Sequence, residues 1–223
     1  MVSPSQLKRV IGRIDNRFNN SEPQDAHELL VFLLEKLKEM PGEAMIDVKF
    51  AGTLRSLMRC FSCSSVSGAS QEINCLSLKL SDQGRQSLSD ILEVFFSEEV
   101  IPLEEKWICG QCSKVSEGGK QLVLEENPLL LLLQLARFSF QEGVFWKNEC
   151  EVGVPEFVGI SGSTYRLVGV VRHTGSRKSG HYTAQIQSRL GWQLCDDDRV
   201  TRSQRQPMEW CRSAYLLVYE YAA

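Results

Sequence analysis

The sequence predicts an α+β fold, because helical patterns occupy its first half and short strands fill its last third. A helical pattern of apolar residues follows Ser21, and a second one follows Ser87. Residues 165–221 are rich in Val, Tyr and Leu between Gly- or charge-bearing turns, which is typical of an antiparallel sheet. No internal repeat or Pro/Ser linker divides the 223 residues, so we expect one domain.

The first helix is predicted over residues 22–40. Ser21 and Gln24 have the spacing of a capping box, and Pro23 in the first turn costs no hydrogen bond. Apolar residues then recur at helical spacing until a Pro-Gly pair ends the pattern. Three of them are expected to face the core: Leu29, Leu33 and Leu37.

The second helix is predicted to begin after Ser87 and to end near Ser97. Asp90, three residues after Ser87, completes a capping pattern. Residues 88–96 place apolar side chains along one face of the helix. The leucine run at residues 129–135 is read as a buried strand, since a membrane span needs about 18 apolar residues. Four further strands are expected over residues 165–172, 181–187, 192–195 and 214–221.

Charge and the N-terminal residues exclude several classes of function. Lys and Arg number 25 against 28 Asp and Glu, which gives a net charge of −3 and no basic excess for nucleic acid or anionic membranes. The first residues also lack the apolar core of a signal peptide. We therefore expect a cytoplasmic or nuclear protein without nucleic-acid or membrane partners.

Two Cys-x-x-Cys pairs predict a metal site. Cys60, Cys63, Cys109 and Cys112 can place four thiolates around one tetrahedral Zn²⁺, with no open position for a catalytic water, so the role would be structural. The alternative is that they are small buried hydrophobes or redox thiols. The other cysteines are irregularly spaced and are read as core or surface thiols: Cys75, Cys150, Cys195 and Cys211.

His181 is the histidine with the most informative surroundings, because it follows a Gly- and Ser-bearing loop and opens a predicted strand. A hairpin from residue 181 to 196 would bring a carboxylate beside its ring. Asp196 or Asp197 could then orient the imidazole, leaving its other nitrogen to deprotonate a thiol. The alternative is a turn histidine beside a solvated acidic turn.

Taken together, these segments resemble the ubiquitin-specific proteases, cysteine proteases that cleave ubiquitin from its conjugates. Residues 23–29, Pro-Gln-Asp-Ala-His-Glu-Leu, are similar to the family's Gln-Asp-Ala-His-Glu box, and residues 127–138 are similar to its Pro-x-x-Leu to Arg-Phe strand. The closing residues 165–219, with Gly180-His181-Tyr182 and Asp196-Asp197, are similar to its histidine box.

The resemblance implies a papain-like hand of thumb, fingers and palm that grips ubiquitin and threads its C-terminal tail through a channel. Its parts would be thumb helices at 1–48, zinc-ribbon-like fingers at 49–135 and the palm sheet at 136–223. It implies His181 as general base, Asp196 as its orienting partner and Asp197 as a supporting polar residue. Asp25 and Glu28 would face the channel and pair with arginines of the tail.

The chain departs from the family at the nucleophile. The family's Gly-Asn-Thr-Cys-Tyr-like box precedes the Gln-Asp-Ala-His-Glu helix, whereas the first cysteine here is Cys60. We therefore predict an N-terminally truncated hand that is inactive alone. Three interpretations remain: a fragment of a deubiquitinase, a pseudoenzyme that binds ubiquitin or scaffolds a partner without cleaving anything, and a zinc-stabilised interaction or scaffold module. The expected partner is ubiquitin or a ubiquitinated protein. Adaptor proteins are possible partners in each.

Overall fold

The computed structural model describes residues 4–20, 22–40, 49–82, 84–141, 143–176, 179–204, 207 and 210–222. Its helices are α1 (Pro4–Ile14), α2 (Ala26–Lys38) and α4 (Leu88–Phe96), with short 3-10 helices η1 (Asn16–Phe18) and η2 (Leu103–Glu105). The strands of the first half are β1 (Gly52–Cys60), β2 (Val66–Ile73), β3 (Leu76–Lys79), β4 (Arg85–Ser87), β5 (Glu99–Ile101), β6 (Gly118–Glu126) and β7 (Leu130–Ala136). Those of the second half are β8 (Phe138–Gln141), β9 (Val144–Lys147), β10 (Glu151–Gly153), β11 (Phe157–Ile160), β12 (Ser163–Gly175), β13 (Gly180–Ser188), β14 (Gly191–Asp196), β15 (Arg199–Arg202), β16 (Trp210–Cys211) and β17 (Ala214–Tyr221).

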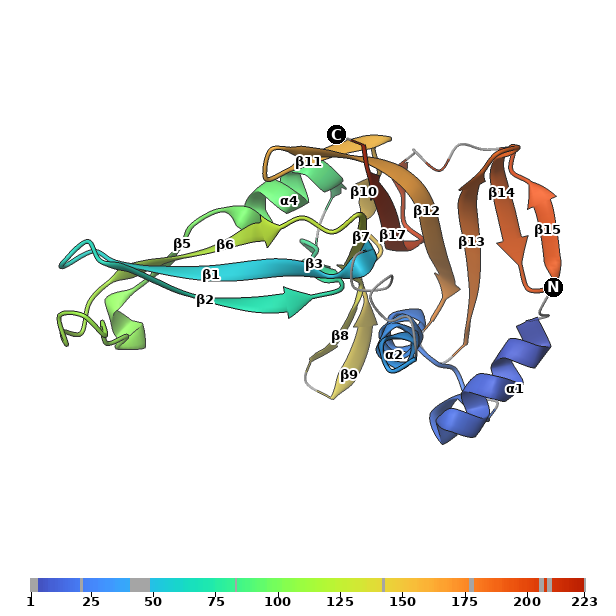
Figure 1. The fold of residues 1–223 in the computed structure, drawn as a ribbon, viewed down its shortest axis with the longest axis horizontal. Helices are drawn as coiled ribbons and strands as arrows, with labels where there is room; N and C mark the ends of the chain where they lie inside the picture. The colour runs from blue at the N-terminus through green and yellow to red at the C-terminus, as the bar shows by residue number, and fades with distance from the viewer. Residues whose placement is uncertain are drawn as a thin grey trace.

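An eight-stranded sheet forms the wide body of the molecule (Figure 1). Its strands follow the order β15-β14-β13-β12-β17-β7-β3, and β11 pairs with β12. All pairs are antiparallel except β3 with β7. The four strands expected in the last third are confirmed, and so is the leucine strand β7, which places Leu131, Leu133 and Leu135 at 1% exposure or less.

A second sheet extends from the body as an arm (Figure 1). Its order is β2-β1-β6-β5, and β1 and β6 each run for nine residues. Leu54 and Leu124, which face each other across β1 and β6, belong to the same buried core as the body. Residues 49–135 therefore contribute to the arm and, through β3 and β7, to the body sheet.

Helix α4 follows the sequence prediction residue by residue. The Ser87 hydroxyl accepts from the Asp90 N–H at 3.1 Å, and the Asp90 carboxylate accepts from the Ser87 N–H at 3.4 Å. The helix ends before Ser97, as expected, and its Leu88, Ile91 and Leu92 are buried. Such a cap stabilises a helix by about 1 kcal/mol.

Helix α2 is shorter than the predicted 22–40 helix. It begins at Ala26, and the Asp25 side chain accepts from the N–H groups of His27 and Glu28, so the cap at Ser21 was the wrong choice. Asp25 is the N-cap because its extended backbone lets one carboxylate oxygen accept from two N–H groups that have no partner within the helix. The Pro-Gly pair lies outside the described residues.

The core-facing side of α2 also differs from the prediction. Leu37 is 40% exposed, so its expected core position is wrong. Leu29 and Leu33 pack, half-buried, against a small cluster formed by Ile11, Phe18 and Phe32. Leu37 lies one turn after Leu33, in the last turn of α2, and does not pack against this cluster.

Arg137 holds the junction between the body sheet and the following hairpin. Its guanidinium is fully buried and donates to the carbonyl oxygens of four residues: Ala214 at 2.5 Å, Asn148 at 2.9 Å, Cys150 at 3.0 Å and Cys211 at 3.3 Å. A buried cation normally needs such partners, and here backbone carbonyls supply them all. Burial lowers the pKa of Arg137.

Within the described part of the chain, no helix is both long enough and apolar enough to cross a bilayer.

Candidate active site and metal centre

The structure brings His181 and Asp196 into direct contact. His181 is the second residue of β13 and Asp196 is the last residue of the neighbouring strand β14. The imidazole Nε2 lies 2.6 Å from Asp196 Oδ1, and each side chain is about half-exposed. Because Nε2 is held by the carboxylate, Nδ1 is the ring nitrogen that remains to accept a proton.

The acidic turn raises the basicity of this imidazole. The hydrogen bond to Asp196 raises the pKa of His181 above its usual 6.5, and the negative charges of Asp196 and Asp197 act in the same direction. Asp197 occupies the turn after β14 with a left-handed backbone, at a φ of 49°. The ligand atoms of the three residues lie within 4.8 Å of one another, so Asp197 contributes charge at short range.

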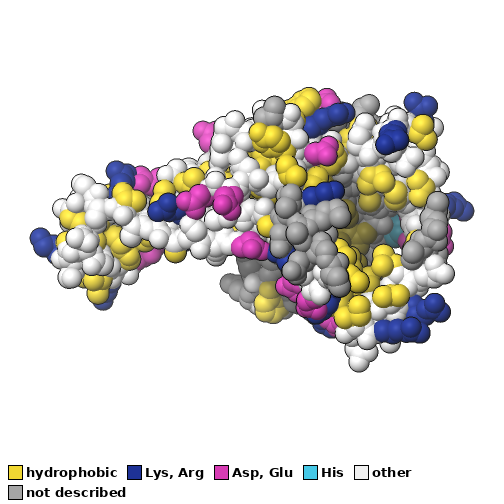
Figure 2. Space-filling view, in the orientation of Figure 1, with side chains coloured by type: hydrophobic (Ala, Val, Ile, Leu, Met, Phe, Trp, Pro, Cys, Tyr) yellow, Lys and Arg dark blue, Asp and Glu magenta, His cyan; other side chains and the backbone are white. Residues whose placement is uncertain are grey.

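A cavity of about 500 Å³ lies beside the loop that leads into His181. It is bounded by the start of α2, by β8 and by the facing ends of β12 and β13. Figure 2 shows a hollow in the half of the molecule that contains β12 and β13. Its walls combine aromatic rings with acidic and amide groups: Pro23, Gln24, Asp25, Glu28, Phe138, Ser139, Phe140, His173, Gly180 and Tyr182. We refer to it as the α2 cavity.

Asp25 and Glu28 both line the α2 cavity but differ in how they are used. Asp25 caps α2 with one oxygen and accepts the Tyr215 hydroxyl with the other, at 2.6 Å. No hydrogen bond or ion pair joins the Glu28 carboxylate to another side chain in the described residues, and Glu28 is exposed. Of the two acids, Glu28 is the one available to a ligand.

The ends of β12 and β13 on either side of the loop before His181 are held by contacts that the sequence analysis did not find. Lys147, on β9, donates to the carbonyl oxygens of Gly175 at 2.8 Å and His173 at 3.2 Å. A Cβ atom at Gly180 would lie 2.1 Å from His173 Nε2, so only glycine fits there. The aromatic residues of β8 and β9 on either side of Gly143 were the available signal for the β8–β9 hairpin that carries Lys147.

Burial distinguishes His173 from His181. His173 is 4% exposed, and its Nδ1 has no hydrogen-bond partner among the described residues. Burial lowers its pKa, and the nearby Lys147 charge acts in the same direction. A buried neutral imidazole of this kind suits a structural position beside the loop.

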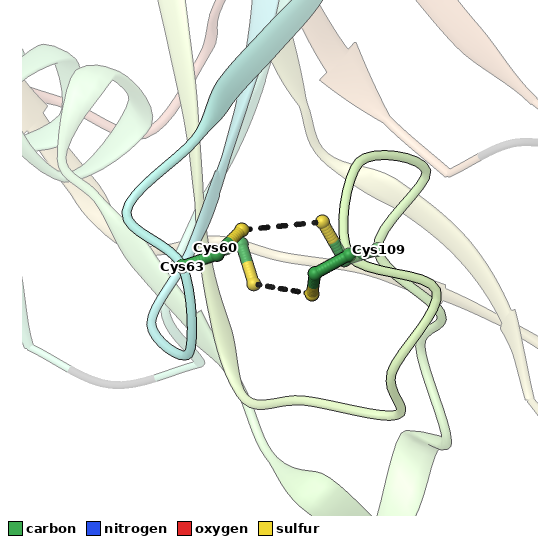
Figure 3. A group of neighbouring side chains, drawn as sticks. Cys60, Cys63 and Cys109 are labelled. Carbon is green, nitrogen blue, oxygen red and sulfur yellow. Dashed lines mark hydrogen bonds between the residues drawn. The ribbon is translucent and has the colours of Figure 1, made fainter.

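The four cysteines of the two Cys-x-x-Cys pairs meet at the end of the arm (Figure 3). Their sulfur atoms lie within 4.8 Å of one another, with Cys60 to Cys112 at 4.0 Å and Cys63 to Cys109 at 3.8 Å. A tetrahedral Zn²⁺ with bonds of about 2.3 Å requires sulfur separations of about 3.8 Å. The donor set and its spacing therefore fit zinc.

The two cysteine pairs have the same backbone geometry. The N–H of Ser64 donates to the Cys60 carbonyl at 2.8 Å, and the N–H of Ser113 donates to the Cys109 carbonyl at 2.9 Å. Both serines adopt left-handed backbones, with φ of 59° and 56°. The Ser65 hydroxyl and backbone N–H groups lower the pKa of Cys109, which favours the thiolate that a metal binds, whereas burial and the neighbouring sulfur atoms raise the pKa of Cys112.

No cysteine contacts His181 in the described residues. Four form the arm-end cluster, and Cys195, beside Asp196, points to the other face of its strand. Burial raises the pKa of Cys75 to about 12, which makes that thiol a poor nucleophile.

Comparison with known proteins was made on the sequence and on the fold. A family model described as ubiquitin carboxyl-terminal hydrolase matches residues 1–219. Ubiquitin carboxyl-terminal hydrolase 2 of Gallus gallus is 30% identical over 268 residues, covering 100% of this chain and 75% of the relative. Ubiquitin carboxyl-terminal hydrolase 25 of Arabidopsis thaliana is 27% identical, covering 97% of this chain but 36% of the relative.

Solved structures show the same architecture. The SAGA Ubp8/Sgf11/Sus1/Sgf73 DUB module bound to ubiquitin aldehyde matches with a TM-score of 0.86 at 24% identity, over 98% of this chain and 54% of the solved one. The module bound to monoubiquitin matches with the same TM-score at 26% identity, over 98% and 53%. The chain thus spans about half of these solved chains, and the α+β hand expected from the sequence is confirmed.

Proposed function

Because the chain belongs to the ubiquitin carboxyl-terminal hydrolase family, we propose that it carries the general base and the tail-binding channel of a deubiquitinase. The observation that carries the proposal is the 2.6 Å contact between His181 and Asp196, because the two neighbours of His181 in the chain, Gly180 and Tyr182, line the α2 cavity. Asp196 orients the ring and stabilises its protonated form, while Asp197 adds negative charge. Nδ1 then takes the proton of a thiol, the thiolate attacks the carbonyl carbon at the ubiquitin C-terminus, and the imidazolium returns the proton to the leaving amine.

The nucleophile is proposed to lie outside this chain's own cysteines, since none of them contacts His181. We infer that the 223 residues alone bind ubiquitin without hydrolysing its conjugates. A fragment of a deubiquitinase and a ubiquitin-binding pseudoenzyme would both behave in this way. The fragment should regain hydrolysis when a thiol is supplied beside Nδ1, whereas the pseudoenzyme should not.

The substrate in this proposal is ubiquitin or a ubiquitinated protein, with its C-terminal tail in the α2 cavity. Glu28 offers an unpaired carboxylate to an arginine of the tail, and the flat rings of Phe138 and Tyr182 line the path beside it. Asp25 supports the same wall through its cap and its bond to Tyr215. Adaptor proteins remain possible partners, as the solved relatives are multi-protein modules.

The arm-end cysteines are proposed to bind one structural Zn²⁺ through Cys60, Cys63, Cys109 and Cys112. The ion would cross-link the end of β1 and the turn after it to the segment between β5 and β6, and four sulfur ligands leave no position for a catalytic water. This feature also favours a second function, in which the zinc-stabilised arm serves as an interaction or scaffold module.

The parts of the hand are proposed as thumb helices in residues 1–48, fingers in 49–135 and palm in 136–223. A cytoplasmic or nuclear location is proposed because none of the eight cysteines forms a disulfide in the structure, as in a reducing compartment.

The test combines binding with chemical capture. The purified chain is titrated with ubiquitin, and separately incubated with ubiquitin that carries a thiol-reactive group at its C-terminus. We expect saturable binding that is lost when the last residues of ubiquitin are removed, and no covalent adduct. Fusing the residues that precede the Gln-Asp-Ala-His-Glu box in the Gallus gallus relative should create an adduct on the added cysteine that depends on His181. The proposal is contradicted by an adduct on the unaltered chain, or by an affinity for ubiquitin that stays the same when the last residues of ubiquitin are removed.

A further inference from the structure

A second cavity lies on the sheet face opposite the α2 cavity. Its volume is about 720 Å³, within the range of small-molecule sites. Arg172 lies on its wall, whereas the next residue, His173, lines the α2 cavity; successive residues of a strand point to opposite faces. The register of β12 to β15 continues this face through Gln185, Leu194 and Thr201, which also line the cavity.

The cavity has a positive lining in a chain of net charge −3. Arg172 reaches it from β12, Arg202 from the end of β15, and Arg212 from the segment before β17. No carboxylate lines it among the residues that the structure describes. Arg212 shares Glu151 with Arg85, so its charge is already partly balanced.

Arg172 and Arg202 lack a counter-charge. The half-buried Arg172 guanidinium donates to Gln185 Oε1 at 3.0 Å, to Cys211 Sγ at 2.7 Å and to Ser213 Oγ at 3.5 Å, none of which is a carboxylate. No ion pair joins either arginine to an acidic residue within the described ranges. Arg202 is exposed, but Arg172 is partly removed from water without an anion beside it, which is costly, so an external anion would be stabilised next to Arg172 and within reach of the Arg202 charge.

The number and type of donors indicate a multivalent phosphate. One arginine fork satisfies a single carboxylate, whereas two unbalanced guanidiniums from separate strands suit a ligand with more than one negative charge. The hydroxyl groups of Thr201 and Ser213 line the same cavity and can donate to phosphate oxygens. We propose that this cavity binds a small molecule bearing at least two phosphate groups, held mainly by Arg172 and Arg202. By the same register His181 and Asp196 lie on this face of the sheet, but neither lines the cavity, and the inference does not rest on the catalytic proposal.

Inorganic pyrophosphate is the probe for this site. Calorimetric titration of the full chain at constant ionic strength should show saturable binding of one pyrophosphate per chain. R172Q and R202Q should each weaken it at least tenfold, while R166Q, on the same strand but paired with Glu156, should change it less than twofold. Circular dichroism establishes that each variant is folded. Equal binding of citrate, equal loss in R166Q, or no binding at millimolar pyrophosphate overturns the proposal.

The location is tested by alkylation of two cysteines on opposite faces of the sheet. Cys211 lines the cavity, and Cys195 neighbours the cavity residue Leu194 and therefore faces away. Saturating pyrophosphate should slow iodoacetamide labelling of Cys211 at least threefold and leave labelling of Cys195 unchanged, as read by mass spectrometry. Unchanged labelling of Cys211 would place the anion elsewhere and refute the assignment.

Discussion

The hydroxyl of Tyr215 donates to the Asp25 carboxylate at 2.6 Å, which ties the start of α2 to a strand 190 residues later in the chain. Gln134 donates to the same hydroxyl at 2.9 Å, so the three groups form a short chain from β7 through β17 to α2. Asp25 is therefore a structural residue as well as a wall of the α2 cavity.

Replacing Asp25 should cost stability. D25A removes the helix cap, worth about 1 kcal/mol, and the Tyr215 partner, worth about 1 kcal/mol, so we expect a loss of about 2 kcal/mol. Y215F should lose about 1 kcal/mol, and the double variant less than the sum. Urea unfolding measures all three, with E22A as the exposed control. A loss below about 0.5 kcal/mol for D25A would show that neither the cap of α2 nor the hydrogen bond with Tyr215 contributes to stability.

Glu28 should decide the affinity for ubiquitin. E28K places a cation where an arginine of the tail is expected, so we predict binding weakened about tenfold or more. E22K, four residues outside the helix and also exposed, should stay within twofold. Both are compared by titration with ubiquitin, and unfolding curves should match the parent. Equal affinities for E28K and the parent would take Glu28 out of the channel.

The two sheet histidines should titrate in opposite directions from 6.5. His181 should titrate above this value because of Asp196, and D196N should bring its pKa down, whereas His173 should titrate below it because of burial. NMR titration of the imidazole C–H resonances measures each pKa. D197N should lower the His181 pKa less than D196N; the reverse order would exchange the roles of the two carboxylates.

These shifts also set the sign of the pH dependence of stability. The His181 contribution is fully present below pH 6.5 and is lost as the pH rises through its raised native pKa. The His173 contribution runs the other way: stability falls as the pH drops below 6.5 towards its lowered native pKa. H173Q should therefore flatten the acid side of the stability profile, and an unchanged acid side would show that His173 is not buried as a neutral ring.

The metal content should be one zinc per chain. The double variant C60S/C109S removes one ligand from each pair and should lose the metal, whereas C195S should keep it. Inductively coupled plasma mass spectrometry after dialysis gives the ratio. A metal-free parent of unaltered stability would contradict the site.

The sequence predicted those elements whose position is set by interactions between residues close together in the chain. The α4 cap, the leucine strand and the C-terminal strands depend on neighbouring residues, and the sequence located them. The start of α2 was missed because two capping patterns compete within five residues, and the contact of Asp25 with Tyr215 that favours one of them is distant in sequence. The same holds for the site. His181 and Asp196 lie on one hairpin, whereas the hydrogen bonds of Lys147 join β9 to the end of β12, two strands that no local pattern connects.

The slenderness of the arm has a consequence for cooperativity. Every residue of β2 before Ile73 is exposed, and the far end of β1 and β6 is closed by Cys60 opposite Gly118 rather than by an apolar core. The body, by contrast, rests on leucine and tyrosine side chains that are almost completely buried. The arm would then behave as a separate folding unit whose opening is governed by the sulfur cluster. On chelation, amide hydrogen exchange should accelerate across residues 55–72 and 99–121, while the amides of β7 and β12 keep the protection of the intact body.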